Sequence, residues 1–191
     1  MNVLVSGDSG FLLRNTLPDY AEWNIISYEH GKSYNNIDMV VHFASPSDRY
    51  DFKDKTRMAR SMVELTLDLV YEAKYNSSKF IFASSMGAKF LEDEYSIYKR
   101  AMEQYISHVL SDYLILRIPR VYDKNRNKGL MYRIRNDEIE QSDWDNKIQY
   151  ITLDDFRVWF KNSLTKSGIQ YYDEPYRVNT IKELKELFCE S

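Results

Sequence analysis

Three side chains near the middle of the chain have the types and spacing to move a proton: Ser85, Tyr95 and Lys99. Tyr95 and Lys99 are four residues apart, so both project from one face if the segment is helical. A free tyrosine has a pKa of about 10 and is a poor base near neutrality. A lysine ammonium beside it favours the phenolate. Such a tyrosine can exchange a proton with a hydroxyl or carbonyl group.

This spacing is not specific by itself, because the chain holds 16 Tyr and chance pairs with a lysine are expected. The alternative is an ordinary pair on a helix surface. Tyr98 is a rival base, but it directly precedes Lys99 and faces another direction. The position of Tyr95 shortly after Ser84-Ser85 favours the chemical interpretation, because those serines close an apolar run that reads as a buried strand.

The elements that must position these side chains alternate along the chain. Continuously apolar runs predict buried strands, and apolar residues at three- and four-residue steps predict helices. The expected strands are Val3–Val5, Trp23–Tyr28, Asp38–Ala44, Phe80–Ala83 and Tyr113–Leu116, and the expected helices are Phe11–Leu17, Arg57–Tyr75 and Tyr95–Leu110. This alternation predicts an α/β fold, a doubly wound parallel sheet with helices on both faces.

From about Arg117 the pattern is less regular. Residues 120–145 are polar and predict a surface segment. Tyr150–Leu153 reads as a strand, followed by a helix to about Leu164 that Asp154 would cap. A short strand at Arg177-Val178 and a final helix to Leu187, capped by Thr180, complete the prediction.

A glycine turn, Ser6-Gly7-Asp8-Ser9-Gly10, follows the first strand. Gly7 and Gly10 would let backbone N–H groups approach a pyrophosphate at a helix N-terminus. The alternative is a plain glycine turn. Glu29, nineteen residues beyond Gly10, could accept hydrogen bonds from an adenosine ribose, which favours NAD, or be a solvated surface residue.

NADP stays open, because nearby cations could serve a 2′-phosphate: Arg14, His30 and Lys32. His42 ends the third strand. It is interpreted either as a hydrogen-bonded core histidine or as a residue that shapes the cofactor cleft.

Composition excludes several classes. The net charge is −3, which argues against general nucleic-acid binding. A single cysteine, Cys189, rules out a disulfide framework and a cysteine-based zinc site, and the three histidines lack metal-ligand spacing, so no metal is expected. No apolar run approaches the roughly 20 residues that span a bilayer, and the N-terminus is unlike a signal peptide. We expect a soluble, cytoplasmic protein without a membrane partner.

Taken in order, these motifs resemble the extended short-chain dehydrogenases/reductases, in particular the sugar-nucleotide epimerases and reductases. The resemblance covers nearly the whole chain. It is carried by the segments Ser6–Leu12, Asp38–Ala44, Phe80–Ser85, Tyr95–Lys99, Leu116-Arg117 with Val121-Tyr122, and Tyr150–Asp155. An unusually short member of this family is therefore expected, acting as an NAD(P)-dependent oxidoreductase or epimerase on a nucleotide-activated sugar.

The resemblance implies roles for individual residues. Tyr95 would be the proton-transfer group, Lys99 would bind the nicotinamide ribose, and Ser85 would hold the substrate oxygen. The implied cofactor contacts are Gly7, Ser9, Gly10, Phe11, Leu12, Glu29, Phe43, Ala44, Ser45, Ala83, Tyr95 and Lys99. The implied substrate contacts are Ser85, Met86, Arg120 and Tyr122, with Arg117 nearby.

Several departures from the family pattern stand out. Leu13 replaces the third glycine, the segment between Glu29 and Asp38 is too short for the usual helix and strand, and the asparagine that assists the lysine is missing. The chain is expected to form one compact unit of two partly interleaved parts, a cofactor-binding domain, residues 1–119, and a reduced substrate-binding region packed on it, residues 120–191. These losses leave an alternative, a non-catalytic NAD(P)-binding module.

Relatives dimerise through the helices that correspond to Arg57–Tyr75 and to the helix beginning at Tyr95. Exposed methionine and tyrosine side chains on both helices would permit the same contact, so a homodimer is expected. A dehydratase is disfavoured, because Met86 and Gly87 stand where dehydratases carry an acidic pair.

Overall fold

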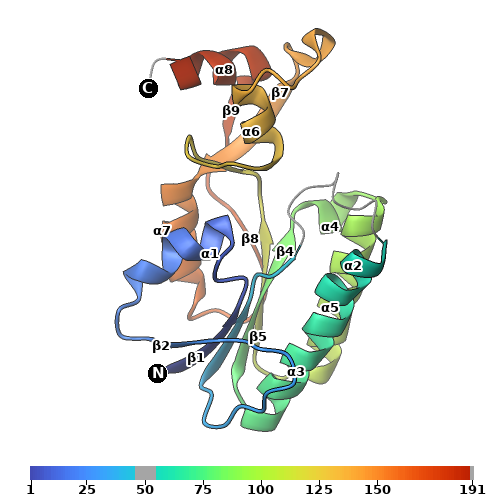
Figure 1. Cartoon of the computed structure of the whole chain (residues 1–191), viewed down its shortest axis with the longest axis vertical. Helices are drawn as coiled ribbons and strands as arrows, with labels where there is room; N and C mark the ends of the chain where they lie inside the picture. Colours follow the sequence, from blue (N-terminus) through green and yellow to red (C-terminus); the bar gives the residue numbers. More distant parts are fainter. Residues whose placement is uncertain (46–54, 190–191) are drawn as a thin grey trace. The chain divides into compact units, whose positions relative to one another are not determined.

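The structure is a computed structural model that describes residues 1–45 and 55–189 (Figure 1). The side chains of Lys55, Arg57, Phe188 and Cys189 lie outside that description. Contacts divide the chain into two units: the first contains Met1–Ile118 and Lys161–Tyr171, and the second contains Pro119–Phe160 and Tyr172–Ser191. Within the described residues, no helix is long and apolar enough to cross a membrane.

A six-stranded sheet forms the centre of the first unit, in the order β2-β1-β3-β4-β5-β8. Its strands are β1 (Asn2–Ser6), β2 (Asn24–Ser27), β3 (Met39–His42), β4 (Lys79–Ser85), β5 (Tyr113–Ile118) and β8 (Gly168–Tyr171). Every pairing is parallel. The predicted α/β class, with a Rossmann-like sheet, is confirmed.

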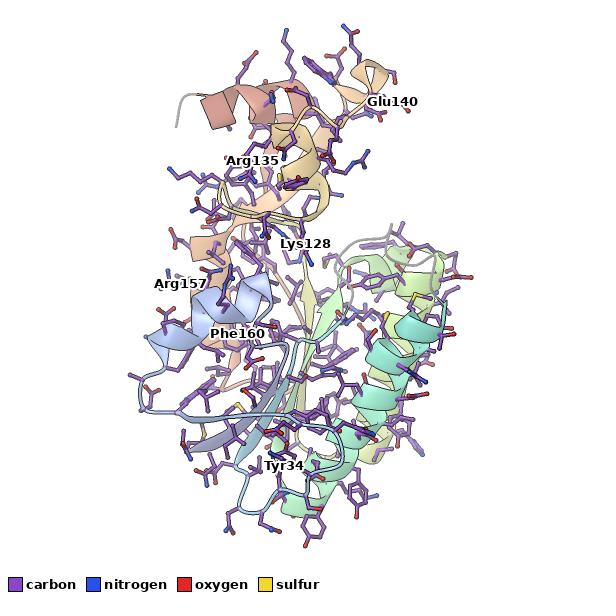
Figure 2. The ribbon with its side chains drawn as sticks, viewed as in Figure 1. Tyr34, Lys128, Arg135, Glu140, Arg157 and Phe160 are labelled. Atoms are coloured by element: carbon purple, nitrogen blue, oxygen red, sulfur yellow. The ribbon has the colours of Figure 1, made fainter. Side chains whose placement is uncertain are left out.

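Helices lie on both sides of this sheet, which is why its central strands are continuously apolar. In Figure 1, α3 (Leu65–Asn76) and α5 (Glu94–Val109) lie on one side and α1 (Phe11–Thr16) on the other. The core beneath α3 and α5 includes Leu4, Val40, Leu69, Phe80, Phe82, Met102, Ile106 and Ile115. Tyr34, labelled in Figure 2, closes this core beside the end of α3, where its carbonyl accepts a 3.1 Å hydrogen bond from Asn76.

The helix predicted at Arg57–Tyr75 is present but not uniform. It consists of α2 (Lys55–Ala59), one turn of π-helix (Arg60–Glu64) and α3. Met58 and Met62 are buried at 1% and 2% exposure, as is Met102 on α5 at 8%. The expectation of exposed methionines on these helices is therefore wrong, because their side chains fill the core.

Two short elements link the larger ones in the first unit. The chain after α1 makes a 3-10 turn, Leu17–Asp19, which contains Pro18. The residues between β4 and α5 form α4 (Gly87–Phe90), and the side chain of Asp93 caps α5 by accepting a 3.1 Å hydrogen bond from Ser96 N. This cap fixes where α5 begins.

The second unit holds a three-stranded sheet in the order β6-β7-β9. Its elements are β6 (Val121–Tyr122), α6 (Gly129–Arg135), a 3-10 turn (Gln141–Asp143), β7 (Lys147–Thr152), α7 (Leu153–Ser163), β9 (Arg177–Thr180) and α8 (Ile181–Cys189). Its core packs α6 and α8 on β7 through Met131, Ile134, Ile148, Tyr150, Ile181 and Leu184.

Helix starts in the second unit follow reciprocal capping. Thr180 and Glu183 exchange backbone-to-side-chain hydrogen bonds of 2.7 and 3.1 Å, so the predicted Thr180 cap is confirmed. Thr152 and Asp155 make the same exchange, at 2.9 and 3.1 Å, at the start of α7. The predicted cap at Asp154 is therefore wrong by two residues.

Candidate active site

The strand order of the first sheet reverses at β1, whose neighbours are β2 and β3. In open α/β sheets, ligands bind outside the carboxyl ends of the strands at such a reversal. The predicted glycine turn starts there, because Gly7 directly follows Ser6, the last residue of β1. Phe43 and Ala44 follow β3 on the neighbouring strand, and both of their backbone N–H groups donate to Ser6 O, at 2.9 and 3.1 Å.

Gly7 is required at this place by its conformation and by its surroundings. Its φ is +84°, a left-handed conformation that favours glycine, and a Cβ on it would lie 2.5 Å from Ala44 N. A Cβ on Gly10 would lie 2.9 Å from the Gly7 carbonyl oxygen. The turn is thus a backbone cradle against the end of β3 that larger residues would fill.

Helix α1 begins directly after this cradle. Gly10 is its N-cap, and among the described residues no side-chain hydrogen bond caps it. Phe11 and Leu12 therefore place the backbone of the first turn at the carboxyl edge of the sheet, next to the exposed Ser9. Leu13, in place of a third glycine, is 1% exposed and packs inward, so α1 forms without that glycine.

His42 joins the ends of β1 and β3 to α3. Its Nδ1 lies 2.6 Å from Ser6 Oγ and its Nε2 lies 2.9 Å from Thr66 Oγ1. The Thr66 hydroxyl donates to Met62 O at 2.8 Å, so Nε2 carries the proton, and in the neutral ring Nδ1 then accepts from Ser6. Burial and the nearby Lys99 charge lower the pKa of His42 to about 3. The core-histidine interpretation fits this neutral, fully hydrogen-bonded ring.

Two carboxylates lie near the end of β2. Asp8, in the glycine turn, accepts a 2.6 Å hydrogen bond from Ser27 Oγ. Glu29 is exposed and forms an ion pair of 2.6 Å with Lys32. Of the other cations, His30 lies 3.3 Å from Asp68, and Arg14 lies in the last turn of α1. The acidic side chain thus lies where the spacing predicts it, paired with one of the competing cations.

Lys99 is the buried charge of this edge, at 3% exposure. Its ammonium donates a 2.6 Å hydrogen bond to Ala83 O of β4, and it lies 4.5 Å from the Phe82 ring centroid and 5.7 Å from that of Tyr95. Burial lowers the pKa of Lys99 to about 7, against the opposing attraction of Glu103. A lysine with this environment can change charge near neutrality.

Tyr95 lies beside this lysine on α5, and Ser85 is the last residue of β4, the strand whose Ala83 carbonyl the lysine contacts. Both are partly buried, and Tyr95 is the tyrosine over whose ring the ammonium lies. Ser85 ends β4, and its Oγ accepts a 3.1 Å hydrogen bond from Gly87 N. A Cβ on Gly87 would lie 2.9 Å from Ser96 Oγ of α5, so this glycine lets α4, with Met86 as its N-cap, approach α5 closely.

A second buried charge cluster lies behind Lys99, and the sequence analysis missed it. Glu103, at 2% exposure, accepts hydrogen bonds from Ser84 Oγ and from Nε and Nη2 of Arg117, the latter at 2.6 Å. Arg117 also donates to Tyr171 at 2.6 Å. Arg117 was expected near substrate, but its guanidinium is held by Glu103. The spacing of four residues from Lys99 to Glu103 places the two on one helix face, but it gives no signal for the pairing of Glu103 with Arg117.

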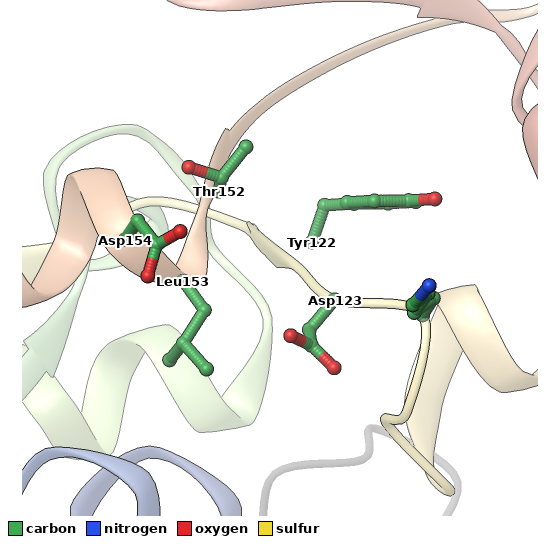
Figure 3. Close-up of a pocket in the computed structure, with 6 residues that line it drawn as sticks. Tyr122, Asp123, Thr152, Leu153 and Asp154 are labelled. Carbon is green, nitrogen blue, oxygen red and sulfur yellow. The ribbon is translucent and has the colours of Figure 1, made fainter. Parts of the chain in front are cut away.

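The second unit contains a small pocket of about 250 Å³ (Figure 3). It is lined by Tyr122, Asp123, Lys124, Thr152, Leu153 and Asp154. The ring of Tyr122, a predicted substrate contact, packs against the Tyr150 ring in a tilted arrangement, with 5.3 Å between the ring centroids. Arg120 is exposed beside this strand, and its carbonyl accepts a 2.9 Å hydrogen bond from Ile151 N. The pocket combines an aromatic ring, carboxylates and a lysine.

Solved structures of similar fold cover nearly the whole chain. MoeE5 in complex with UDP-glucuronic acid and NAD aligns with a TM-score of 0.82 and 17% identity, over 100% of this chain and 82% of that one. A tyrosine-to-phenylalanine variant of UDP-glucuronic acid 4-epimerase from Bacillus cereus, in complex with UDP-4-deoxy-4-fluoro-glucuronic acid and NAD, gives 0.80 and 15%, over 100% and 82%. For dTDP-4-dehydrorhamnose reductase from Bacillus anthracis, in complex with NADP, the values are 0.76 and 13%, over 99% and 80%.

These neighbours are sugar-nucleotide enzymes of the extended short-chain dehydrogenase/reductase type, and they confirm the predicted resemblance at the level of the fold. At these identities the likeness shows the fold alone. No family model matches the sequence, and no curated protein does.

Proposed function

We propose that the protein is an NAD(P)-dependent oxidoreductase or epimerase that acts on a nucleotide-activated sugar. The observation that carries this proposal is the buried Lys99 ammonium, which lies over the Tyr95 ring at the carboxyl end of β4. That arrangement stands on the same sheet edge as the glycine cradle at β1 and β3. A proton-transfer pair and a nucleotide-binding turn at one edge are what this class of reaction needs.

The residues of the first unit fit a dinucleotide. The Gly7–Gly10 cradle and the first turn of α1 would hold the pyrophosphate, with Ser9, Phe11 and Leu12. Phe43, Ala44 and Ser45 after β3, together with Ala83 of β4, would contact its remaining length. A nicotinamide cofactor bound there would supply hydride transfer.

NAD is the proposed cofactor, and NADP stays open. Glu29 and Asp8 place carboxylates near the end of β2, where a 2′-phosphate would be repelled. Lys32 already pairs with Glu29. Both cofactors occur among the structural neighbours, so these charges are the reason for the preference.

Each proposed catalytic residue has a defined task. The Tyr95 phenolic oxygen takes a proton from, or returns it to, the substrate hydroxyl, because the Lys99 charge stabilises its phenolate. The Lys99 ammonium has three N–H donors, of which Ala83 O takes one, so others can reach the nicotinamide ribose. The Ser85 hydroxyl, at the end of β4, would orient the substrate oxygen.

For the substrate, Ser85 and Met86 of the first unit would contact the reacting sugar. In the second unit, Arg120 and Tyr122 are the proposed substrate contacts. Arg120 is suited to a diphosphate, since a guanidinium binds phosphate through paired N–H donors. The proposed cofactor-binding part is residues 1–119 and the proposed substrate-binding part is residues 120–191, although Lys161–Tyr171 lie in the first unit by their contacts. The non-catalytic alternative is not favoured, because the neighbours of this fold are enzymes.

A homodimer and a cytoplasmic location are also proposed. Three exposed apolar side chains recur at four-residue steps on α3: Leu67, Tyr71 and Tyr75. Tyr71 and Tyr75 are 66% and 64% exposed. Ile97 and Tyr105 on α5 are also exposed, and this surface supports a contact with a second copy.

Native mass spectrometry with NADH and NADPH, added separately, tests the cofactor proposal. We expect one NADH per chain and weaker binding of NADPH. Glu29→Gln should narrow the difference in binding between NADH and NADPH. Glu22→Gln, a change at an exposed glutamate before β2, should leave this difference unchanged. Failure of both cofactors to bind would overturn the proposal, and equal effects of the two variants would remove Glu29 from the cofactor site.

A further inference from the structure

Two residues of α5 that lie one helical turn apart, Lys99 and Glu103, contact two consecutive residues of β4, Ala83 and Ser84. Lys99 donates to Ala83 O at 2.6 Å, and Glu103, one helical turn later, accepts from Ser84 Oγ. Arg117 on the adjacent strand β5 holds the other side of the Glu103 carboxylate. The Glu103 oxygens thus already have strong donors, although an ammonium lies one turn away on the same helix face.

This arrangement matters because a buried ammonium loses its proton unless a nearby negative charge stabilises it. The titratable groups that face Lys99 are Tyr95 and Glu103 from α5, and His42 from β3, with Arg117 behind Glu103. His42 is neutral, because burial and the Lys99 charge lower its pKa to about 3. Glu103 is therefore the carboxylate whose attraction opposes the burial of Lys99.

We propose that Glu103, held by Arg117 and Ser84, is a positioning residue that favours the charged form of Lys99 without drawing its ammonium away from Tyr95. If Glu103 had no other partners, a direct ion pair would pull the Lys99 side chain toward the interior. Arg117 and Ser84 prevent this by donating hydrogen bonds to the carboxylate, and the lysine keeps its hydrogen bond to Ala83 O. The role that this gives Lys99 rests on the proposed function, but the charge relation itself does not.

Arg117 affects the pKa of Lys99 in the direction opposite to Glu103. It neutralises part of the Glu103 charge through its hydrogen bonds to that carboxylate, so removing it strengthens the net attraction on the lysine. Loss of Glu103 and loss of Arg117 should therefore move the titration of Lys99 in opposite directions. A merely structural role of the pair would disturb packing in both variants but would not reverse the sign.

The test is an NMR titration of protein labelled at the lysine side chains, without cofactor or substrate. The Lys99 resonance is identified by its loss in Lys99→Met. Glu103→Gln should lower the pKa of Lys99 by about one unit or more, and Arg117→Met should raise it. Glu72→Gln is the matched control, because Glu72 is also buried, at 8% exposure, but lies on α3, and it should leave the Lys99 titration unchanged.

Glu103→Gln leaves Arg117 buried without its partner and could fail to fold. The double variant Glu103→Gln/Arg117→Met removes both charges, a change that buried ion pairs often tolerate, and it should still lower the pKa of Lys99. An unchanged titration without Glu103, or a lowered pKa in Arg117→Met, would overturn the proposal. Because no cofactor is present, these results are independent of whether the proposed function is correct.

Discussion

At the scale of single residues, the main feature of the candidate site is the buried side chain of Lys99. Lys99 has a folded-state pKa of about 7, below its ordinary value of 10.5. Between these two values the unfolded chain holds a proton that the folded chain lacks, so the stability contribution of this group rises with pH. The cost of burying Lys99 is therefore largest below about pH 7 and disappears above the unfolded value.

Lys99→Met should raise the stability of the fold at pH 6 to 7, since the side chain then carries no charge to bury. The gain should shrink as the pH rises toward 10. Thermal denaturation across this range measures it, with Lys74→Met, a change at an exposed lysine of α3, as the control. A Lys99→Met variant that is less stable than wild type at every pH would show that the hydrogen bond to Ala83 O outweighs the burial cost.

Gly7 gives a second prediction at this scale. Gly7→Ala places a methyl group against Ala44 N and keeps a positive φ, so it should destabilise the fold by roughly 2 kcal/mol or more. Gly31→Ala is the matched control: its φ is +81° but a Cβ there meets nothing within 4 Å, and the strain alone costs about 1 kcal/mol. Urea denaturation compares the two. Equal losses would mean that the end of β3 yields to the methyl group.

Single residues were predicted unevenly. Tyr95, Lys99 and Ser85 follow from spacing and from the ends of predicted elements, and the structure places the first two together. The pairing of Glu103 with Arg117 could not be predicted, because it joins α5 to β5 across β4. A salt bridge between distant segments leaves no local pattern in the sequence.

At the scale of elements, periodicity located the sheet. The strands from β1 to β5 and the helices α1, α3 and α5 lie where apolar patterns predicted them. Helix α6 was missed, because its apolar residues are embedded in a charged segment that reads as surface. Strand β8 was also missed, because it is only four residues long, lies at the edge of the sheet and is exposed at every second residue. Short edge elements carry too few buried residues to give a pattern.

The exposed stripe on α3, formed by Leu67, Tyr71 and Tyr75, gives a prediction at this scale. Tyr71→Lys/Tyr75→Lys should convert the proposed dimer to a monomer without unfolding it, because both tyrosines are largely exposed and a charge in an apolar interface is costly. Light scattering measures the mass. Val158→Lys on α7 is the control, since Val158 is 61% exposed and lies outside the stripe. A wild-type protein that is already monomeric at micromolar concentration would contradict the proposed dimer.

At the scale of the whole molecule, the chain passes between two units more than once. It enters the second unit after Ile118, returns within α7 to supply β8, and leaves again after Tyr171. The sequence indicates a change of character near Arg117, but the return is invisible to it, because α7 is one uninterrupted helix. The first unit carries the glycine turn and the Tyr95–Lys99 pair for which we propose cofactor binding and proton transfer, and the second carries the pocket with Tyr122.

In the proposed function, Tyr95 moves a proton in an NAD(P)-linked reaction on a nucleotide-activated sugar. The direct measurement is turnover of a panel of UDP- and dTDP-sugars with NAD or NADP, with products identified by NMR. We expect wild type to convert at least one of them, Tyr95→Phe to be slower by about 100-fold or more, and the matched neighbour Tyr98→Phe to stay close to wild type. Undiminished turnover in Tyr95→Phe on a substrate that wild type converts would contradict the account.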